Sequence, residues 1–242
     1  MPNTIYWMLA SSDLMPPEAP GVLSPSEFEK FSKFRFPKRQ NEWLLGRWAA
    51  KSLVHSIPAY QHYSLDQIEI CNTPEGAPYI QLPGEVILVD CLSISHSHRF
   101  SLCALAPGPD LRVGADLEKI ESRTETFILD YFTPSERQLV DIYSAEARAL
   151  VATLIWSAKE SMLKALGVGL HWDTRQVEIR EIGELIPGEA SHGGWQKIQV
   201  GDLQQVNRHW AAWWQRRTNF VITMAGFTSK SPKILPVILV EK

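Results

Sequence analysis

Three carboxylates and a lysine, in two short segments of the chain, have the spacing to form a metal site. Asp116 and Glu118 stand two residues apart where apolar and acidic residues alternate, so on a strand both carboxylates project from one face. Glu160 and Lys164 are four residues apart, which makes them neighbours on a helix. Because carboxylates on one face repel each other, a hard cation such as Mg²⁺ fits between them. If the segments meet, Glu160 is a third ligand or a general base, and Lys164 can receive negative charge on a phosphate.

Each half of this arrangement has a structural alternative that the sequence leaves open. Glu160 and Lys164 can form an exposed salt bridge on a helix, and Asp116 and Glu118 can be a charged pair on an edge strand. Either half alone favours the structural interpretation. Only the two halves together indicate a metal site, and that combination depends on their meeting in the fold.

A basic segment lies upstream of these carboxylates. Seven residues from Lys30 to Lys51 are basic and one, Glu42, is acidic, so the segment carries +6 in a chain of formal net charge −3. A local basic segment in an acidic protein is typical of a site for a multiply charged anion. The alternative is a solvated helix face. A phosphate-rich ligand is favoured because the acidic residues downstream need one to make chemical sense.

The segment from Ser93 to Arg99 combines hydroxyl and imidazole groups. His96 and His98 could form a zinc pair, but no cysteine or further histidine stands at a useful spacing. Nucleophilic catalysis by a serine lacks the strand-to-helix motif Gly-x-Ser-x-Gly. The remaining interpretation is a strand end at which Ser95 and His96 contact a phosphate.

The elements that position these residues follow a strand–helix–strand order that occurs twice. Ser24 and Thr133 each open a helix with a capping signature, and Gly167 ends the longest helix. The first pass has strands at 5–9, 68–71, 79–82, 92–95 and 101–106 and helices at 25–36 and 38–56; the second has strands at 112–117, 176–181, 195–200, 211–214 and 219–227 and helices at 134–143 and 145–166. We predict an α/β (α+β) chain with a linker at 107–110 and no repeat in the sequence itself, only in the order of elements.

Composition narrows the class of protein. The chain has 242 residues, of which 45% are hydrophobic, and no apolar run reaches the roughly 18 residues that span a membrane. The N-terminus lacks the features of a secretory signal. Three widely spaced cysteines without a C-x-x-C motif favour buried thiols in a reducing compartment. We therefore expect a cytoplasmic protein that binds neither a membrane nor nucleic acid.

Taken together, these segments resemble the Sfp-type 4′-phosphopantetheinyl transferase family. Its paired signature is similar to Val113–Glu118 and Trp156–Lys164, its serine–histidine motif to Ser93–Ser97, and its basic helix to Lys38–Arg47. Ala77 stands where the family usually has the lysine of Gly-Lys-Pro, which puts that contact with the nucleotide in doubt. The matching segments keep the family's order over a long stretch of the chain.

The resemblance implies an activity and an architecture. Such enzymes transfer the 4′-phosphopantetheine arm of coenzyme A to a serine of an apo acyl or peptidyl carrier protein, with Mg²⁺, and release 3′,5′-ADP. Their fold consists of two similar α/β halves related by a pseudo-twofold axis, with the active site in the cleft between them. In this chain the halves are expected at 1–108 and 109–242, in a monomer. Which carrier is served does not follow from the sequence.

The resemblance also assigns residues. Asp116, Glu118 and Glu160 would hold the metal ion, and Glu160 would take the proton of the attacking serine directly or through a metal-bound water. Lys164 would stabilise the leaving phosphate, and Lys159 would help to hold the ligand. The remaining residues expected to contact coenzyme A are Lys33, Lys38, Arg39, Arg47, Ser95 and His96.

Two other functional classes stay open at this point. A non-catalytic module could bind coenzyme A or a carrier protein without transfer, although three mutually repelling carboxylates argue against it. Nucleic-acid binding could use the basic segment and the run 209–217, in which aromatic and basic residues mix. The alternative for that run is a core strand with two tryptophans on its buried face. The apolar stretch 127–132 could dock a carrier or belong to the core.

Overall fold

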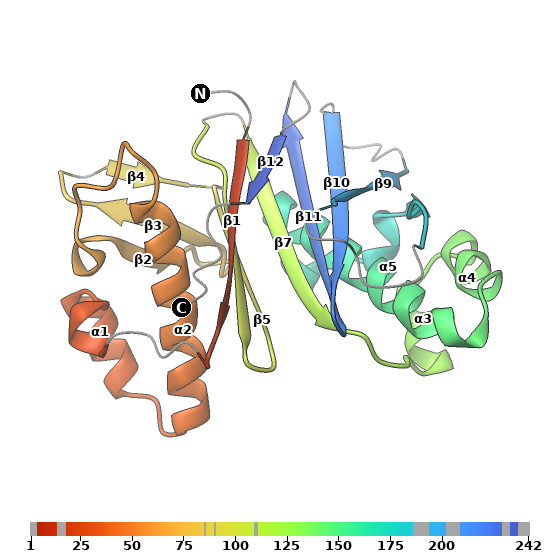
Figure 1. Cartoon of the computed structure of the whole chain (residues 1–242), viewed down its shortest axis with the longest axis horizontal. Helices are drawn as coiled ribbons and strands as arrows, with labels where there is room; N and C mark the ends of the chain where they lie inside the picture. Colours follow the sequence, from red (N-terminus) through yellow and green to blue (C-terminus); the bar gives the residue numbers. More distant parts are fainter. Residues whose placement is uncertain are drawn as a thin grey trace. The chain divides into compact units, whose positions relative to one another are not determined.

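The computed structural model describes residues 4–13, 18–84, 86–89, 91–108, 111–185, 194–201, 209–228 and 233–236. The chain divides into two compact units, Met1–Val113 with Lys233–Lys242, and Gly114–Pro232. Each unit combines β-strands with one long helix (Figure 1), so the predicted mixed α/β class is confirmed. The pseudo-twofold axis and the cleft between the halves stay predictions.

The first unit is built on a sheet with strand order β12-β1-β6-β5. β1 (Thr4–Ser11) pairs antiparallel with β6 (Phe100–Leu105), which pairs antiparallel with β5 (Leu92–Ser97). β12 (Lys233–Pro236) pairs in parallel with β1, with Thr4 opposite Lys233. This pairing explains why the end of the chain belongs to the first unit, whereas the predicted division at 108/109 placed it in the second half.

The helices and a second sheet complete the first unit. α2 (Pro37–His55) packs its apolar side on β1, β5 and β6, and α1 (Pro25–Ser32) precedes it. A small sheet contains β2 (Glu69–Asn72), β3 (Pro78–Leu82) and β4 (Val86–Leu88) in that order. Short 3₁₀ turns occur at Ala19–Gly21 and Leu65–Gln67. The predicted helix to residue 36 ends at Ser32, and Phe36, which precedes a proline, adopts extended angles.

The second unit has a sheet with strand order β7-β11-β10-β9-β8. Its strands are β7 (Arg112–Lys119), β8 (Ile179–Glu181), β9 (Gln196–Val200), β10 (His209–Arg217) and β11 (Phe220–Thr228). The helices are α3 (Glu125–Tyr131), α4 (Pro134–Asp141) and α5 (Ala145–Leu166), with 3₁₀ turns at Gly169–His171 and Thr174–Gln176. α5 packs on β11 and ends at Gly167, whose φ of 74° favours glycine.

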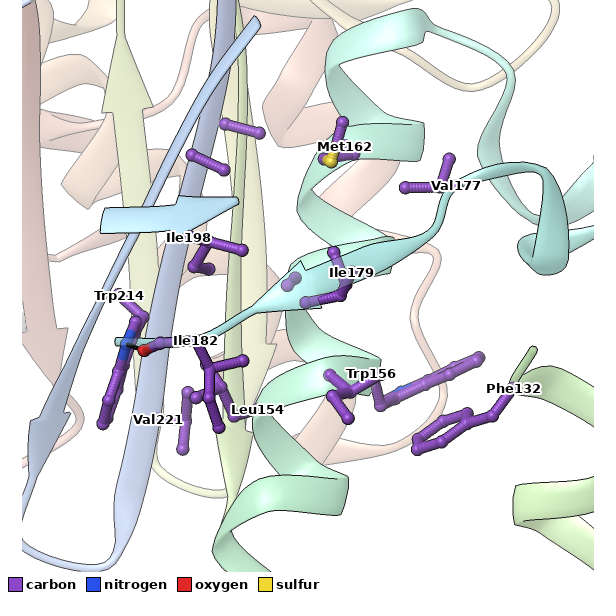
Figure 2. Packing of buried hydrophobic residues seen from close by; sticks show 14 of the residues in the cluster. Phe132, Leu154, Trp156, Met162, Val177, Ile179, Ile182, Ile198, Trp214 and Val221 are labelled. Carbon is purple, nitrogen blue, oxygen red and sulfur yellow. Dashed lines mark hydrogen bonds between the residues drawn. The ribbon is translucent and has the colours of Figure 1, made fainter. Parts of the chain in front are cut away.

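The core of the second unit lies between α5 and the sheet (Figure 2). Leu154 and Met162 of α5 are buried in the same apolar cluster as Trp214 and Val221. The Trp214 indole N–H donates a hydrogen bond of 2.6 Å to the carbonyl of Ile182. The aromatic run of β10 therefore belongs to a core strand, as its structural alternative predicts.

α3 was not predicted as a helix. Within it, Ile128 is buried, whereas Leu129 is 54% exposed and Tyr131 is 40% exposed. The apolar stretch around it thus contributes to both the core and the surface, and a role in carrier docking stays a prediction. No helix among the described residues is long and apolar enough to cross a membrane. The three cysteines are thiols rather than disulfide partners, and two of them are buried.

The capping glutamates of α1 and α4 make the same buried contacts in both units. Glu27 accepts a hydrogen bond of 3.0 Å from the Ile70 amide and pairs with the ammonium of Lys51. Glu136 accepts one of 2.8 Å from the Ile179 amide and pairs with an ammonium of α5 at 2.8 Å. Both glutamates also complete capping boxes, and both are fully buried.

These contacts reveal a repeat of individual residues. Glu136 follows Glu27 by 109 residues, and Ile179 follows Ile70 by the same interval. The long helices α2 and α5 begin 108 residues apart, as do the strands β1 and β7. The repeat therefore extends beyond the order of elements that the sequence predicts. It escaped sequence reasoning because few residues other than these buried partners are the same in both units.

Candidate metal and catalytic centre

The three predicted carboxylates meet in the second unit. Asp116 and Glu118 project from β7 and Glu160 projects from α5, and each offers an oxygen atom within 4.8 Å of the others. Such a cluster of hard oxygen donors fits a small divalent cation such as Mg²⁺. The predicted convergence of the two segments is confirmed.

Gly114 allows β7 and α5 to approach so closely. It lies two residues before Asp116 and faces α5, where an added Cβ would stand 1.8 Å from the carbonyl oxygen of Ser161 and 2.6 Å from the amide nitrogen of Ala165. Both atoms belong to the backbone of the helix and cannot turn aside. A residue with a side chain at this position therefore separates the strand from the helix and moves the carboxylates apart.

We expect Gly114→Ala to reduce both stability and metal binding. Relieving the overlap requires α5 to shift, at a cost of about 1–3 kcal/mol for an overpacked core. Urea unfolding measures the first effect, and the dissociation constant of Mn²⁺ measures the second. Gly194→Ala serves as control, since a Cβ there meets nothing within 4 Å. Equal stability of the two variants would contradict the close approach.

Lys164 links two of the three carboxylates. Its ammonium lies 2.6 Å from Oδ1 of Asp116 and 3.6 Å from Oε2 of Glu160. Asp116 is only 2% exposed. Although burial disfavours the ammonium, these two carboxylates raise the pKa of Lys164. The pair of Glu160 and Lys164 is thus part of a largely buried network, in contrast to the exposed helical salt bridge of the structural alternative.

Burial and mutual repulsion disfavour the ionised forms of Glu118 and Glu160. Burial, followed by the negative charge of Asp116, raises the pKa of Glu160 to about 7, and the ammonium of Lys164 only partly opposes this. Burial and Asp116 also raise the pKa of Glu118, against the effect of the Arg123 guanidinium 2.8 Å away. A bound cation would relieve this repulsion, so the donor set fits Mg²⁺.

The raised pKa of Glu160 predicts how stability depends on pH in the metal-free protein. Between the ordinary value of 4.5 and about 7, the folded protein keeps a proton that the unfolded chain has released, so stability falls as pH rises through this window. We expect a loss on the order of 2 kcal/mol between pH 5 and pH 8, measured by urea unfolding with a chelator. Glu160→Gln should flatten the profile; an unchanged slope would contradict the shift.

Lys159 lies outside the acidic cluster, and its role in holding the ligand stays a prediction. Its side chain is fully buried, pairs with Glu136 at 2.8 Å and donates to the carbonyls of Thr174 and Val177 at 2.9 and 2.6 Å. The neighbouring position on α5, Glu160, faces the acidic cluster instead. Lys159 is the counterpart of Lys51 in the first unit, and its contacts join α5 to the start of α4.

The predicted ligands on α2 and β5 belong to the first unit. His96 is exposed on β5, and its ring lies against the α2 backbone, since a Cβ on Gly46 would stand 2.5 Å from its Cε1. Arg47 is largely buried, with its Nε 3.6 Å from Glu27 and its guanidinium over the Trp43 ring.

The other predicted ligands of the first unit differ in exposure. Ser95 of β5 is buried. Lys33 and Lys38 extend into solvent beside Glu29 and Glu42, at 2.6 and 3.9 Å. Arg39 is exposed near the start of α2. The contacts of these residues with a ligand at the acidic cluster stay predictions.

Three residues around the cluster were missed by sequence reasoning. Arg123 pairs with Glu118, and the hydroxyls of Ser157 and Thr223 form a buried pair next to Asp116. Ser157 stands inside the segment Trp156–Lys164, so its position was available as a signal. Arg123 and Thr223 are ordinary polar residues in the sequence, and only the fold brings them to the site.

Comparisons with known proteins agree with this centre. Residues 112–225 match the sequence model of the 4′-phosphopantetheinyl transferase superfamily. An L-aminoadipate-semialdehyde dehydrogenase-phosphopantetheinyl transferase of Xenopus laevis is 24% identical over 76% of this chain and 66% of its own length. The 4′-phosphopantetheinyl transferase HetI of a Nostoc species is 26% identical over 62% of this chain and 61% of its own.

Among solved structures, a holo-(acyl-carrier-protein) synthase of Bacillus anthracis, in complex with CoA, has a TM-score of 0.39. It is 16% identical and aligns with 49% of this chain and 96% of its own. The chain spans less than two thirds of the first curated relatives that it matches, with shares of 66%, 56% and 61%.

The second unit is a mixed α/β unit in which an acidic cluster lies between a strand and a long helix, and this cluster fits a divalent cation. The matched residues 112–225 include all three carboxylates and Lys164. Residues 112–225 of this chain are similar to the 4′-phosphopantetheinyl transferase superfamily, in agreement with the names of the curated relatives.

Proposed function

We propose that this protein transfers the 4′-phosphopantetheine arm of coenzyme A to a serine of a carrier protein, with Mg²⁺, and releases 3′,5′-ADP. The observation that carries the proposal is the convergence of Asp116, Glu118 and Glu160 within 4.8 Å beside the ammonium of Lys164. Three carboxylates and a lysine match the needs of a pyrophosphate held through a divalent cation.

The residues of the second unit have separate roles in the proposed reaction. Asp116, Glu118 and Glu160 hold the ion, which when bound neutralises charge on the pyrophosphate. The serine oxygen forms a bond to the phosphorus that carries pantetheine while the bond from that phosphorus to 3′,5′-ADP breaks. Glu160 takes up the serine proton, directly or through a water. Lys164 stabilises the negative charge on the departing phosphate.

The first unit supplies the remaining contacts in this proposal. The exposed basic groups near the start of α2, among them Lys33, Lys38 and Arg39, bind phosphates of coenzyme A together with Ser95 and His96. An anion near a helix N-terminus is also favoured by the helix dipole. Arg47, which is largely buried, is included in this proposal as a further contact with coenzyme A. The protein acts as a cytoplasmic monomer on an acyl or peptidyl carrier.

A transfer assay tests the proposal. The full chain is incubated with coenzyme A, Mg²⁺ and a panel of apo acyl and peptidyl carriers, and mass spectrometry follows the mass gain on the acceptor serine. We expect transfer to at least one carrier, its arrest by a chelator and its recovery on adding Mg²⁺. Binding of coenzyme A or of a carrier without mass gain on any panel member would instead identify the non-catalytic module.

A further inference from the structure

A buried pair of hydroxyl groups holds one side of the Asp116 carboxylate. Ser157 of α5 donates a hydrogen bond of 2.8 Å to Oδ2 of Asp116, while Oδ1 lies 2.6 Å from Lys164. Lys164 also contacts Glu160, so Oδ1 is the Asp116 oxygen that faces the rest of the acidic cluster. The two Asp116 oxygens therefore have different partners. Oδ1 faces the cluster, and Oδ2, on the opposite side, accepts the hydrogen bond from Ser157.

The proton count fixes the direction of these hydrogen bonds. The Ser157 hydroxyl has one proton, and the Asp116 carboxylate paired with Lys164 accepts it. The Oγ1 of Thr223, on β11, lies 2.9 Å from the Ser157 Oγ and 2.9 Å from the Ser157 carbonyl oxygen. The single Thr223 proton is donated to Ser157 in either case, to its hydroxyl oxygen or to its carbonyl oxygen, so Thr223 ties Ser157 to β11.

A second buried serine on the same helix shows that this arrangement is not the usual one. Ser161 is as deeply buried as Ser157, but its hydroxyl donates to the Ala158 carbonyl in its own helix, at 2.9 Å. Buried helical serines commonly satisfy their hydroxyl in this local way. The Ser157 hydroxyl instead donates its only proton to the Asp116 carboxylate on β7, and Thr223 of β11 lies next to it.

We propose that Ser157 and Thr223 are positioning residues that present the Asp116 carboxylate to the metal ion. The Ser157 hydrogen bond to Oδ2 restrains the rotation of the carboxylate about its Cβ–Cγ bond, so that Oδ1 stays directed at the cluster, where the metal ion would be held. Both hydroxyls are fully buried, so no solvent water can take over their role. This inference rests on the proposed function, because it requires a metal ion at the cluster.

Mn²⁺ binding to the full-length protein without substrates tests the proposal by a readout other than activity. Ligand-orienting groups typically change metal affinity by about 10–100-fold. We expect Ser157→Ala to raise the Mn²⁺ dissociation constant about tenfold or more and Thr223→Val severalfold, measured by electron paramagnetic resonance. Thr223→Ser, which keeps the hydroxyl, should restore affinity to within twofold of wild type, and Ser161→Ala is the matched control.

The outcomes separate this inference from the proposed function. If Ser157→Ala lowers stability but leaves Mn²⁺ affinity within twofold of wild type, the pair is only structural and the inference is wrong, while the proposed function stands. An equal loss of affinity in Ser161→Ala also overturns it. If the wild-type protein binds no Mn²⁺ and Asp116→Asn changes nothing, the metal site itself is refuted, and the inference fails with it.

Discussion

Replacing Glu160 by glutamine should lower the rate of phosphopantetheine transfer about a thousandfold while the protein stays folded. Glutamine keeps the shape of the side chain but cannot take up the serine proton, and loss of a general base typically costs about 10²–10⁴-fold in rate. It is also a weaker ligand for a hard cation. Initial rates of holo-carrier formation at saturating coenzyme A, followed by mass spectrometry, measure the effect.

The stability of the variant makes this result interpretable. Because the buried Glu160 carboxylate is repelled by Asp116, its removal should leave the metal-free protein at least as stable as wild type at pH 8. Glu146→Gln is the matched control, since Glu146 is exposed in the first turn of the same helix. Transfer by Glu160→Gln within threefold of wild type would refute the assignment of Glu160.

The second large effect is expected from Lys159→Met, and it is an effect on folding. Methionine has a similar length but leaves the fully buried Glu136 without its cation, and breaking a buried ion pair typically costs about 3–5 kcal/mol. Burial already raises the pKa of Glu136 against the opposing effect of Lys159. The loss measured by urea unfolding should therefore be larger at pH 8 than at pH 5.

Two further variants decide what Lys159 does. Adding Glu136→Gln to Lys159→Met removes the stranded charge and should recover part of the lost stability. Lys197→Met, at an exposed position of β9, should change it by less than about 0.5 kcal/mol. A Lys159→Met protein with unchanged stability but a raised KM for coenzyme A would support the ligand-holding role that the resemblance implied.

The sequence was informative where local patterns decide the structure. The capping residues Ser24 and Thr133, the glycine after α5 and the alternation around Asp116 all depend on neighbours within a few positions. The elements 125–131, 86–88 and 233–236 were missed. The first two are short, and β12 forms only because β1, more than two hundred residues away, offers it an edge.

In the candidate site, too, the sequence was informative about local spacing and uninformative about partners from distant elements. The spacing of Asp116 and Glu118 and of Glu160 and Lys164 predicted which side chains share a face, and the fold brought the faces together. Lys159 shows the limit of prediction from the sequence, because a lysine next to a glutamate of the predicted metal site suggests a role in ligand binding. Only its buried partner, which comes from a different helix, reveals the structural role.

The repeat of buried contacts means that the same structural framework occurs twice in the chain, although the two units differ at the acidic cluster. Counted by the interval of 108 residues, the first unit has Met8 and Ala10 where the second has Asp116 and Glu118, and Ser52 stands at the position of the third carboxylate. Met8 and Ala10 are buried in an apolar cluster, which cannot accept charge. Among the residues that the structure describes, the acidic cluster thus exists in one copy. Titration with Mn²⁺ should accordingly saturate at one ion per chain.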